Sequence, residues 1–535
     1  MFFAPIMASA ATYYVSTTGL DSNAGTSSSQ PWKTIAKVNS VPFSSGDFIL
    51  FKRGETWSET LIPPSSGNAG SPITFGAYGT GDLPTIDGTG RDYCVSSNKD
   101  YTTITDLHFT SANKYCIAHT KWDAHGNILS TPGWIIKNSK FTHCGVFLFG
   151  PNTIVQDSVF AGPAIRTAEG AAIVFSGPVS VNCSALRNNI SGYTSRGIWF
   201  NGVGGAATAN DNIIHDIALT VGSTWEGYCI NFDGYGYSIP GTVTALRNTI
   251  YNCASNGIEM ENCIGNTLIS GNLIHDCQRA GVLFVNYAAG TNYPDLRGLD
   301  VHGIVEHNII YRCTAAIQLR QVSGVDIWNN VIYDGVGSYP SGLAIFDNGT
   351  YYVTDIDFRN NIVGSGMTRT CTTSFALKNH FSAFDNNAVV NPVINERDKS
   401  NYLTLAQLQA EGAASHCFTT SPGFVDAAGH DFHLLSSSPC INAGANVGLT
   451  QDYEGNTIPQ GAAPDIGAFE YVGSAPPPSS TPGDLNNDGK VDVSDLSIVA
   501  LDFGKTSGFS NAKSDTNNDV IVDIFDIVFV ASRFT

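Results

Sequence analysis

Short stretches in which apolar and polar residues alternate recur along the centre of the chain, each with an asparagine near its start. In eight of them Ile or Val follows the Asn within two positions. They are RNNIS (187–191), DNIIH (211–215), RNTIY (247–251), GNLIH (271–275), HNIIY (307–311), NNVIY (329–333), NNIVG (360–364) and NNAVV (386–390). The spacing between them is 22 to 36 residues. A strand repeated at this period predicts an all-β solenoid, in which each coil packs its apolar side chains on those of the next coil.

The recurring asparagine has a physical reason to occupy one position of each coil. Asn tolerates the left-handed backbone that a sharp corner requires, and its amide can bond to the Asn one coil away. We therefore expect a ladder formed by Asn189, Asn212, Asn248, Asn272, Asn308, Asn330, Asn361 and Asn387.

Two further columns keep a fixed distance from this asparagine. Cysteines follow it by five residues, and aromatic or histidine residues follow it by three. The cysteines are expected to stack as small apolar side chains, with a disulfide as the alternative. The rings are expected to stack as a ladder on the surface and not to act in catalysis. The columns are Cys253, Cys277 and Cys313, and His215, Tyr251, His275, Tyr311 and Tyr333.

A second strand also recurs, and its central copies carry acids. Its copies are AIVFS (172–176), GIWFN (197–201), CINFD (229–233), GIEME (257–261), GVLFV (281–285) and AIQLR (316–320). Alternation sends the Ile and Phe columns inward and the remaining positions outward. One outward column is Val174, Trp199, Asn231, Glu259, Leu283 and Gln318, and the other is Ser176, Asn201, Asp233, Glu261, Val285 and Arg320. The buried face fixes the register, so residues in one column are predicted neighbours.

This register places three acids on one patch of the outer face. Adjacent coils lie about 4.8 Å apart, so Asp233 and Glu261 are predicted neighbours with Glu259 beside them. Three carboxylates repel one another unless a proton, a metal or a cationic partner compensates. Because this arrangement costs stability, we interpret Asp233, Glu259 and Glu261 as catalytic residues.

Composition limits the partners of the chain. Its 535 residues include 27 Lys and Arg against 46 Asp and Glu, giving a net charge of −19. Nucleic acid is therefore not an expected partner, since phosphate binding requires clustered Lys and Arg. Residues 1–11 have an apolar run ending in small residues and are interpreted as the remnant of a secretory signal. No later window is long and apolar enough for a predicted transmembrane segment.

At its two ends the main segment carries further recognisable motifs. The opening YYVSTTGLDSNAG to KVN (13–39) is followed by GDFILFKRGETW (46–57), and SPCINAG to PDIGAFEY (438–471) closes the segment. With the repeated strands, these motifs resemble the right-handed parallel β-helix proteins of the pectate lyase-like superfamily. The resemblance covers residues 12–472 and implies the fold. Because lyases, hydrolases, epimerases and adhesins share this fold, it does not by itself imply one activity.

A second module is predicted after a Pro- and Ser-rich linker at residues 473–482. Residues 483–535 contain two acidic loops in which oxygen side chains alternate as in EF-hand calcium loops. The expected ligands are Asp484, Asn486, Asp488, Lys490, Asp492 and Asp495, then Asp515, Asn517, Asp519, Ile521, Asp523 and Asp526. In the second loop Val520 replaces the glycine of the sharp turn.

The tandem loops, each followed by a predicted short apolar helix (496–503 and 527–534), resemble type I dockerins. This resemblance implies bound Ca²⁺ and docking to a cohesin domain of a scaffoldin or cell-surface protein. Val493-Ser494 and Ile524-Phe525 occupy the positions where dockerins carry partner-recognition residues. Dockerins are usually joined to enzymes that degrade polysaccharides, so the resemblance also favours a secreted, extracellular enzyme in a cellulosome-like complex.

Residues around the acids are predicted to bind a sugar. They are Trp199, Asn201, Trp225, Glu226, Asn231, Tyr235 and Arg320. Aromatic rings can stack on pyranose faces, and the polar side chains can bond to hydroxyl groups. The low number of Lys and Arg favours a neutral glycan over a polyuronate, unless calcium bridges the charges.

Three functions remain open from the sequence. The first is glycoside hydrolysis, with Asp233 as nucleophile or base and Glu259 or Glu261 as acid. The second is calcium-dependent β-elimination on a uronate polymer, for which the E-x-E pair resembles the calcium cluster of alginate lyases, although the expected Lys base is missing. The third is a non-catalytic carbohydrate-binding β-helix. We expect the hydrolase.

Overall fold

The computed structural model describes most of the chain. The described residues are 10–119, 131–162, 170–220, 226–234, 241–263, 265–286, 300–346, 353–373, 380–391, 394–396, 401–410, 412–472, 485–486, 490–506, 509–511, 513–516, 521–531 and 533. The chain divides into two compact units, residues 1–470 and 471–535. Residues 1–9 of the predicted signal remnant (residues 1–11) and the linker at residues 473–482 lie outside the described residues.

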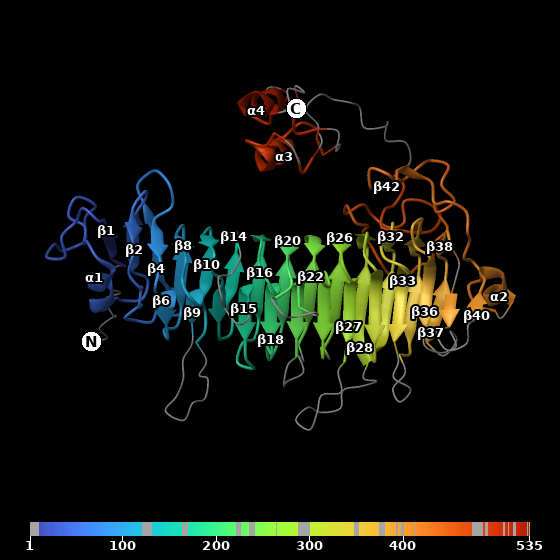
Figure 1. The fold of residues 1–535 in the computed structure, drawn as a ribbon, viewed down its shortest axis with the longest axis horizontal. Coiled ribbons are helices and arrows are strands. Elements are labelled where there is room, and N and C mark those ends of the chain that lie inside the picture. Colours follow the sequence, from blue (N-terminus) through green and yellow to red (C-terminus); the bar gives the residue numbers. More distant parts are fainter. Residues whose placement is uncertain are drawn as a thin grey trace, which may run out of the picture. The chain divides into compact units, whose positions relative to one another are not determined.

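The first unit contains three long sheets (Figure 1), and from β4 to β39 successive strands of the chain enter the three sheets in turn. The first sheet contains β1 (Thr12–Val15), β2 (Phe48–Lys52), β4 (Ile73–Tyr78), β7 (Thr102–Thr105), β10 (Ile135–Lys137), β13 (Ile154–Gln156), β16 (Cys183–Leu186), β19 (Ala207–Asn210), β22 (Val243–Leu246), β25 (Thr267–Ser270), β28 (Asp300–Glu306), β31 (Ser323–Trp328), β34 (Ile356–Arg359) and β37 (Phe381–Asp385). The second contains β3 (Thr56–Trp57), β5 (Thr85–Asp87), β8 (His108–Thr110), β11 (Lys140–Thr142), β14 (Val159–Ala161), β17 (Asn189–Ser191), β20 (Ile213–Ile217), β23 (Thr249–Cys253), β26 (Leu273–Cys277), β29 (Ile309–Tyr311), β32 (Val331–Tyr333), β35 (Ile362–Val363) and β38 (Ala388–Val389). The third contains β6 (Tyr93–Ser97), β9 (Tyr115–His119), β12 (Val146–Leu148), β15 (Ala171–Ser176), β18 (Arg196–Asn201), β21 (Tyr228–Asp233), β24 (Ile258–Glu261), β27 (Ala280–Val285), β30 (Ala315–Arg320), β33 (Ser341–Phe346), β36 (Arg369–Thr373), β39 (Ile394–Glu396) and β40 (Asn401–Leu403).

Neighbouring strands run parallel through these sheets, and only the last pair of the third sheet, β39 and β40, is antiparallel there. The inward side chains form one apolar core along the whole stack. Phenylalanines stack in it from coil to coil, as Phe175, Phe200 and Phe232 do at centroid distances of 5.0 and 4.7 Å. The short helix α1 (Ile35–Ser40) belongs to the first coil, and α2 (Leu405–Ala410) and the hairpin of β41 (Phe424–Asp426) and β42 (Asp431–Leu434) follow the last coils. The structure confirms the predicted all-β solenoid.

The asparagine ladder is present, but its first rung is Asn188 and not Asn189. Both the backbone N–H and Nδ2 of Asn188 donate to Oδ1 of Asn212 at 3.0 Å. The same pair of hydrogen bonds links each asparagine to the next along the ladder, through Asn248, Asn272, Asn308, Asn330, Asn361 and Asn387. Asn189 instead begins β17, with Val159 and Ile213 as its strand neighbours.

The expected left-handed backbone lies one residue before each ladder asparagine. Arg187, Asp211, Arg247 and His307 have φ of 53°, 59°, 52° and 51°, and their following asparagines are not in this region. The corner is therefore made by the preceding residue, and the asparagine amide bonds the corner to the next coil. The prediction that the asparagine itself takes this conformation was wrong.

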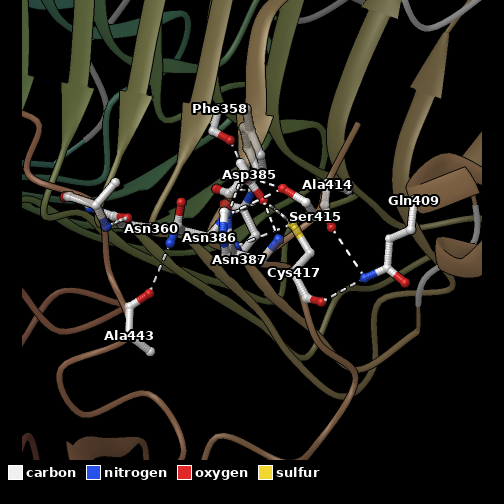
Figure 2. A network of polar contacts seen from close by, with 12 residues as sticks. Phe358, Asn360, Asp385, Asn386, Asn387, Gln409, Ala414, Ser415, Cys417 and Ala443 are labelled. Carbon is white, nitrogen blue, oxygen red and sulfur yellow. Dashed lines mark hydrogen bonds and ion pairs between the residues drawn. The ribbon is translucent and has the colours of Figure 1, made fainter. Parts of the chain in front are cut away.

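The ladder ends at a cysteine in place of another asparagine (Figure 2). The backbone N–H and Nδ2 of Asn387 donate to Sγ of Cys417 at 3.3 and 3.7 Å. Gln409 of α2 donates from Nε2 to the carbonyls of Ala414 and Cys417 at 3.2 and 3.1 Å. The segment after α2 thus satisfies the polar groups that the last coil would otherwise leave without a partner.

The two side columns also formed in register. His215, Tyr251, His275 and Tyr311 stack with ring centroids 4.6, 5.2 and 4.7 Å apart, which confirms the ladder of rings. The fifth predicted member, Tyr333, packs edge-on against Phe424 at 5.9 Å.

The cysteine column combines the two expected outcomes. Cys253 forms a disulfide with Cys229, whereas Cys277 and Cys313 are free and buried. Cys253 and Cys277 are strand neighbours, so these sulfurs follow one another along the coils.

The described residues of the second unit include two helices, α3 (Val493–Asp502) and α4 (Ile524–Ala531), and a small apolar cluster. Each helix begins three residues earlier than predicted. For α3 the reason is a capping box, in which Asp492 accepts from the Ser494 N–H at 2.7 Å and Asp495 accepts from the Asp492 N–H at 3.0 Å. Among the described residues of the chain, no helix has the length and apolarity of a membrane span.

Candidate active site

The acids lie on the outer face of the third sheet in the predicted register. Asn231 is paired with Glu259 and Asp233 with Glu261 between β21 and β24, and Asn201 of β18 is paired with Asp233. The alternate residues Ile258 and Met260 belong to the main core. Successive side chains of a strand point to opposite faces, so the carboxylates point outward, as predicted.

The outer face is less open here than the sequence suggested. Asp233 is 4% exposed and Glu259 is 2% exposed, while Glu261 is half-buried. Two small apolar clusters flank the acids on this face, one on the side of β15 and β18 and the other on the side of β27 and β30. They are Ala171, Val174 and Trp199, and Ala280, Leu283, Val285, Ala315 and Ala344. The carboxylates therefore lie between apolar walls.

Hydrogen bonds orient two of the three carboxylates. Nε1 of Trp199 donates to Oδ2 of Asp233 at 3.3 Å, and Nδ2 of Asn256 donates to Oε2 of Glu259 at 2.8 Å. Asn256 is itself fixed, because its Oδ1 accepts from the Ala280 N–H at 2.9 Å. Trp199, predicted to bind substrate, thus acts on Asp233 within the site.

Burial alters the proton affinity of both glutamates. Burial raises the pKa of Glu259 to about 7, and the charge of Asp233 acts in the same direction, while the Asn256 hydrogen bond and the charges of Arg196 and Arg320 oppose it. Burial and the charges of Asp233 and Glu259 also raise the pKa of Glu261. Below neutral pH both glutamates are therefore mainly protonated, which relieves the repulsion expected from three charges.

The raised pKa of Glu259 predicts how the free energy of unfolding depends on pH. The native state keeps the Glu259 proton up to about pH 7, whereas the unfolded chain releases it near pH 4.5. Native Glu259 therefore binds more protons in this window, and stability falls as the pH rises through it. Glu259→Gln removes this cost. The variant is expected to gain up to about 3 kcal/mol relative to the parent between pH 4 and pH 8. Guanidinium unfolding at both pH values measures the gain, and an equal difference at both would contradict the assignment.

A basic group is fixed beside the acids. Nε of Arg196 donates to Oδ1 of Asn231 at 2.9 Å, and its guanidinium lies over the Trp199 ring at 4.0 Å. Glu226 holds the other side of Arg196, with Nη1 and Oε1 3.7 Å apart. Glu226 also accepts from Ser195 and Thr220 at 3.3 and 2.7 Å. Glu226, predicted to bind a sugar, therefore positions Arg196 in this structure.

A cleft of about 200 Å³ opens next to Glu259, toward β27 and β30. This volume is below the range of about 300–1,000 Å³ of pockets for larger ligands, which limits the described cleft to a small group such as one sugar ring. Its polar lining includes Asn256, Glu259, Arg279, Gln318 and Arg320, and its apolar lining includes Tyr228, Leu283 and Phe346.

The cleft contains some of the predicted residues and adds others. Glu259 and Arg320 line it, whereas Asp233, Glu261, Trp199, Asn201, Asn231 and Glu226 are not among its described lining residues. Trp225 and Tyr235 lie outside the described residues. Gln318 and Leu283 belong to the same outward column as Glu259, so the strand repeat could have identified them as lining residues. Tyr228 opens β21, and Asn256 and Arg279 lie in turns just before β24 and β27, where no repeat pattern marks them.

The lyase hypothesis requires a calcium ion held by the three acids. A cation site requires several oxygen atoms that converge. Among the described residues, Asp233, Glu259 and Glu261 do not bring three ligand atoms within 4.8 Å of one another. One oxygen of Asp233 and one of Glu259 already accept from Trp199 and Asn256. The arrangement of these side chains does not fit a calcium ion held by the three acids.

Comparison with known proteins agrees with this architecture. A family model described as the right handed beta helix region matches residues 196–404. A curated protein named lacto-N-biosidase, from Bifidobacterium longum subsp. longum, is 43% identical over 79 residues, which are 14% of this chain and 5% of that protein. The chain thus spans about one twentieth of the length of this relative.

Solved structures provide the broader match. The complex of XylC with xylose has 14% identity and a TM-score of 0.50, covering 86% of this chain and 98% of that one. The GH136 lacto-N-biosidase from Eubacterium ramulus has 14% identity and a TM-score of 0.43, covering 71% and 67%. With the three parallel sheets, the family match and the similarity to XylC show that residues of the first unit form a right-handed parallel β-helix.

Proposed function

We propose that the chain is a secreted glycoside hydrolase that cleaves a glycan on the outer face of its β-helix. The observation that carries the proposal is Glu259, a buried carboxyl with a pKa of about 7 that lines a cleft and lies diagonally across from Asp233. The local identity to a protein named lacto-N-biosidase supports a role in glycan cleavage.

In this mechanism Glu259 is the general acid. Its proton passes to the glycosidic oxygen as the bond to the anomeric carbon breaks, so the leaving sugar departs as an alcohol. Asp233, held by the Trp199 indole, supplies the negative charge. It either attacks the anomeric carbon or takes a proton from the water that does. The configuration of the first product distinguishes these two roles.

Glu261 supports this division of roles. Because its pKa is raised, it is neutral at the pH where Glu259 holds its proton. A neutral Glu261 does not place a second negative charge beside Asp233, its neighbour on the next strand. Arg196 lies near the same group and lowers the pKa of both glutamates, although less than burial raises it.

The test is a screen of the full chain on xylan, arabinan, pectin, alginate and β-glucans. We expect new reducing ends without absorbance near 232 nm, and retention of most activity in EDTA. An unsaturated product that absorbs near 232 nm and disappears in EDTA would identify the calcium-dependent lyase instead. Binding without any product would identify a carbohydrate-binding protein.

We also propose that residues 483–535 form a dockerin that holds two calcium ions and docks to a cohesin. In both copies the last acid of the loop closes it in the same way. Asp495 accepts from the Leu485 and Asn486 N–H groups at 2.7 and 3.0 Å, and Asp526 accepts from the Thr516 N–H at 2.7 Å. Asp492, Asp515, Asp523, Lys490 and Ile521 are also described, whereas Asp484, Asp488, Asn517 and Asp519 lie outside the described residues.

Calcium removal tests this module. EDTA is expected to unfold the second unit while the β-helix keeps its transition, because the small cluster of the second unit buries few apolar side chains. Calorimetry of the full chain should then show loss of one transition, restored by added Ca²⁺ but not by Mg²⁺. Identical traces with and without EDTA would contradict the calcium assignment. Binding to immobilised cohesins tests the partner separately.

A further inference from the structure

The cleft next to Glu259 concentrates positive charge in an acidic protein. Two of the 27 Lys and Arg residues, Arg279 and Arg320, line it, although the chain has a net charge of −19. The acid facing them is Glu259, whose pKa of about 7 leaves it largely neutral in mildly acidic solution. The described lining of the cleft thus includes two basic side chains and one acid, Glu259, although the overall charge of the chain favoured a neutral glycan.

Arg320 has no carboxylate of the described structure as an ion-pair partner. Other arginines on the β-helix do: Arg187 pairs with Asp157 at 2.6 Å, Arg247 with Asp211 at 2.7 Å and Arg312 with Asp276 at 2.6 Å. The guanidinium of Arg320 instead lies over the ring of Phe346, 5.4 Å from its centroid. This contact orients the guanidinium without neutralising it. Arg320 lines the cleft, so its guanidinium can bind an anion there.

The remaining lining suits a sugar ring. Phe346, Leu283 and Ala315 belong to one apolar cluster on this face and can pack against the CH groups of a pyranose. The amide of Gln318 and the hydroxyl of Thr314 also line the cleft and can bond to sugar hydroxyl groups. Glu259 stands at the side of the cleft that adjoins Asn231 and Asp233.

We propose that this cleft is a subsite for a sugar ring that carries an anionic substituent, a carboxylate or a sulfate ester, bound by the guanidinium of Arg320 with Arg279 beside it. The inference rests on the proposed function in taking the occupant to be a glycan. A sugar ring bound in this subsite lies next to Glu259, so the scissile bond lies at or beside the ring that carries the anionic substituent.

Binding of small sugars to the full chain tests the proposal without requiring turnover. Glucuronate, galacturonate and galactose 6-sulfate are titrated against neutral glucose and galactose, with saturation-transfer NMR as the readout. We expect at least one charged sugar to bind about tenfold more tightly than its neutral counterpart, since one charge-assisted hydrogen bond supplies this much. High salt should reduce this ratio. Uronate binding assigns a carboxylate, and binding of the sulfated sugar assigns a sulfate ester.

Three variants test whether Arg320 causes the tighter binding of charged sugars. Arg320→Gln should lower the ratio of charged to neutral affinity to about one, and Arg320→Lys should keep part of it because the charge remains. Arg369→Gln is the matched control: Arg369 also lies over an aromatic ring, Tyr339 at 4.5 Å, but does not line the cleft. Equal binding of charged and neutral sugars, or an unchanged ratio in Arg320→Gln, would overturn the proposal. A protein that cleaves only neutral glycans would refute the subsite alone, whereas charged-sugar binding without hydrolysis would refute the proposed function alone.

Discussion

Asp233→Asn and Glu259→Gln are each expected to lower kcat by about 10²–10⁴-fold, because each removes a group that transfers a proton or supplies charge in the transition state. Glu261→Gln is expected to lose less than about tenfold, since Gln resembles the neutral form that Glu261 already adopts. The three variants thus separate the two reacting groups from their protonated neighbour. Rates of reducing-end release on the glycan found in the screen provide the measurement.

A matched control guards against loss of fold. Glu306 is a half-buried glutamate of the β-helix, and burial raises its pKa as well, but it lies at the end of β28 in the first sheet and not in the third. Glu306→Gln should therefore keep the parent activity. Parent-like rates in both Asp233→Asn and Glu259→Gln would remove the site from consideration, and a severe loss in Glu261→Gln alone would move the general acid to Glu261.

The largest effect on stability is expected for Asn308→Ala, in the middle of the ladder. Oδ1 of Asn308 accepts from the backbone N–H and Nδ2 of Asn272 at 3.0 and 2.8 Å. Its Nδ2 donates to the carbonyls of Ile269 and Glu306 and to Asn330. Alanine leaves several of these buried groups without partners, at about 1–3 kcal/mol each. We expect a loss of about 3–5 kcal/mol in the free energy of unfolding.

The control for the ladder is Asn182→Gly. Asn182 makes an exposed side-chain bond to Asn152 at 3.2 Å, and its φ of 55° is a left-handed conformation that Gly adopts without strain. The loss of this bond should therefore change stability by less than about 0.5 kcal/mol. Guanidinium unfolding of the β-helix measures both variants. Similar midpoints for Asn308→Ala and Asn182→Gly would mean that the ladder does not stabilise the coils.

Alternation alone was enough to predict the register of the acidic strands. Ile258 and Met260 had to face inward, and this single requirement paired Asp233 with Glu261 and Asn231 with Glu259. The ladder was misplaced at its first rung because RNNIS offers two adjacent asparagines. The spacing to the buried isoleucine decides between them: Ile190, like Ile214, lies two residues after its ladder asparagine.

The cleft was harder to predict because some of its lining residues lie in strands and others lie in turns. Arg320 and Gln318 occupy strand columns and could be placed from the repeat. Asn256 and Arg279 lie in turns whose conformation the repeat does not determine. The role of Glu226 was also not predictable, since its contact with Arg196 depends on the path of the segment between two coils.

The dependence of kcat/KM on pH tests the central claim most directly, because it reports the ionisation of essential groups in the free enzyme. We predict that the parent loses activity as the pH rises through about 7, where Glu259 releases its proton, and that this alkaline limb is absent from the residual activity of Glu259→Gln. An alkaline limb that stays at the same pH in Glu259→Gln would show that another group is the acid, and would contradict the account.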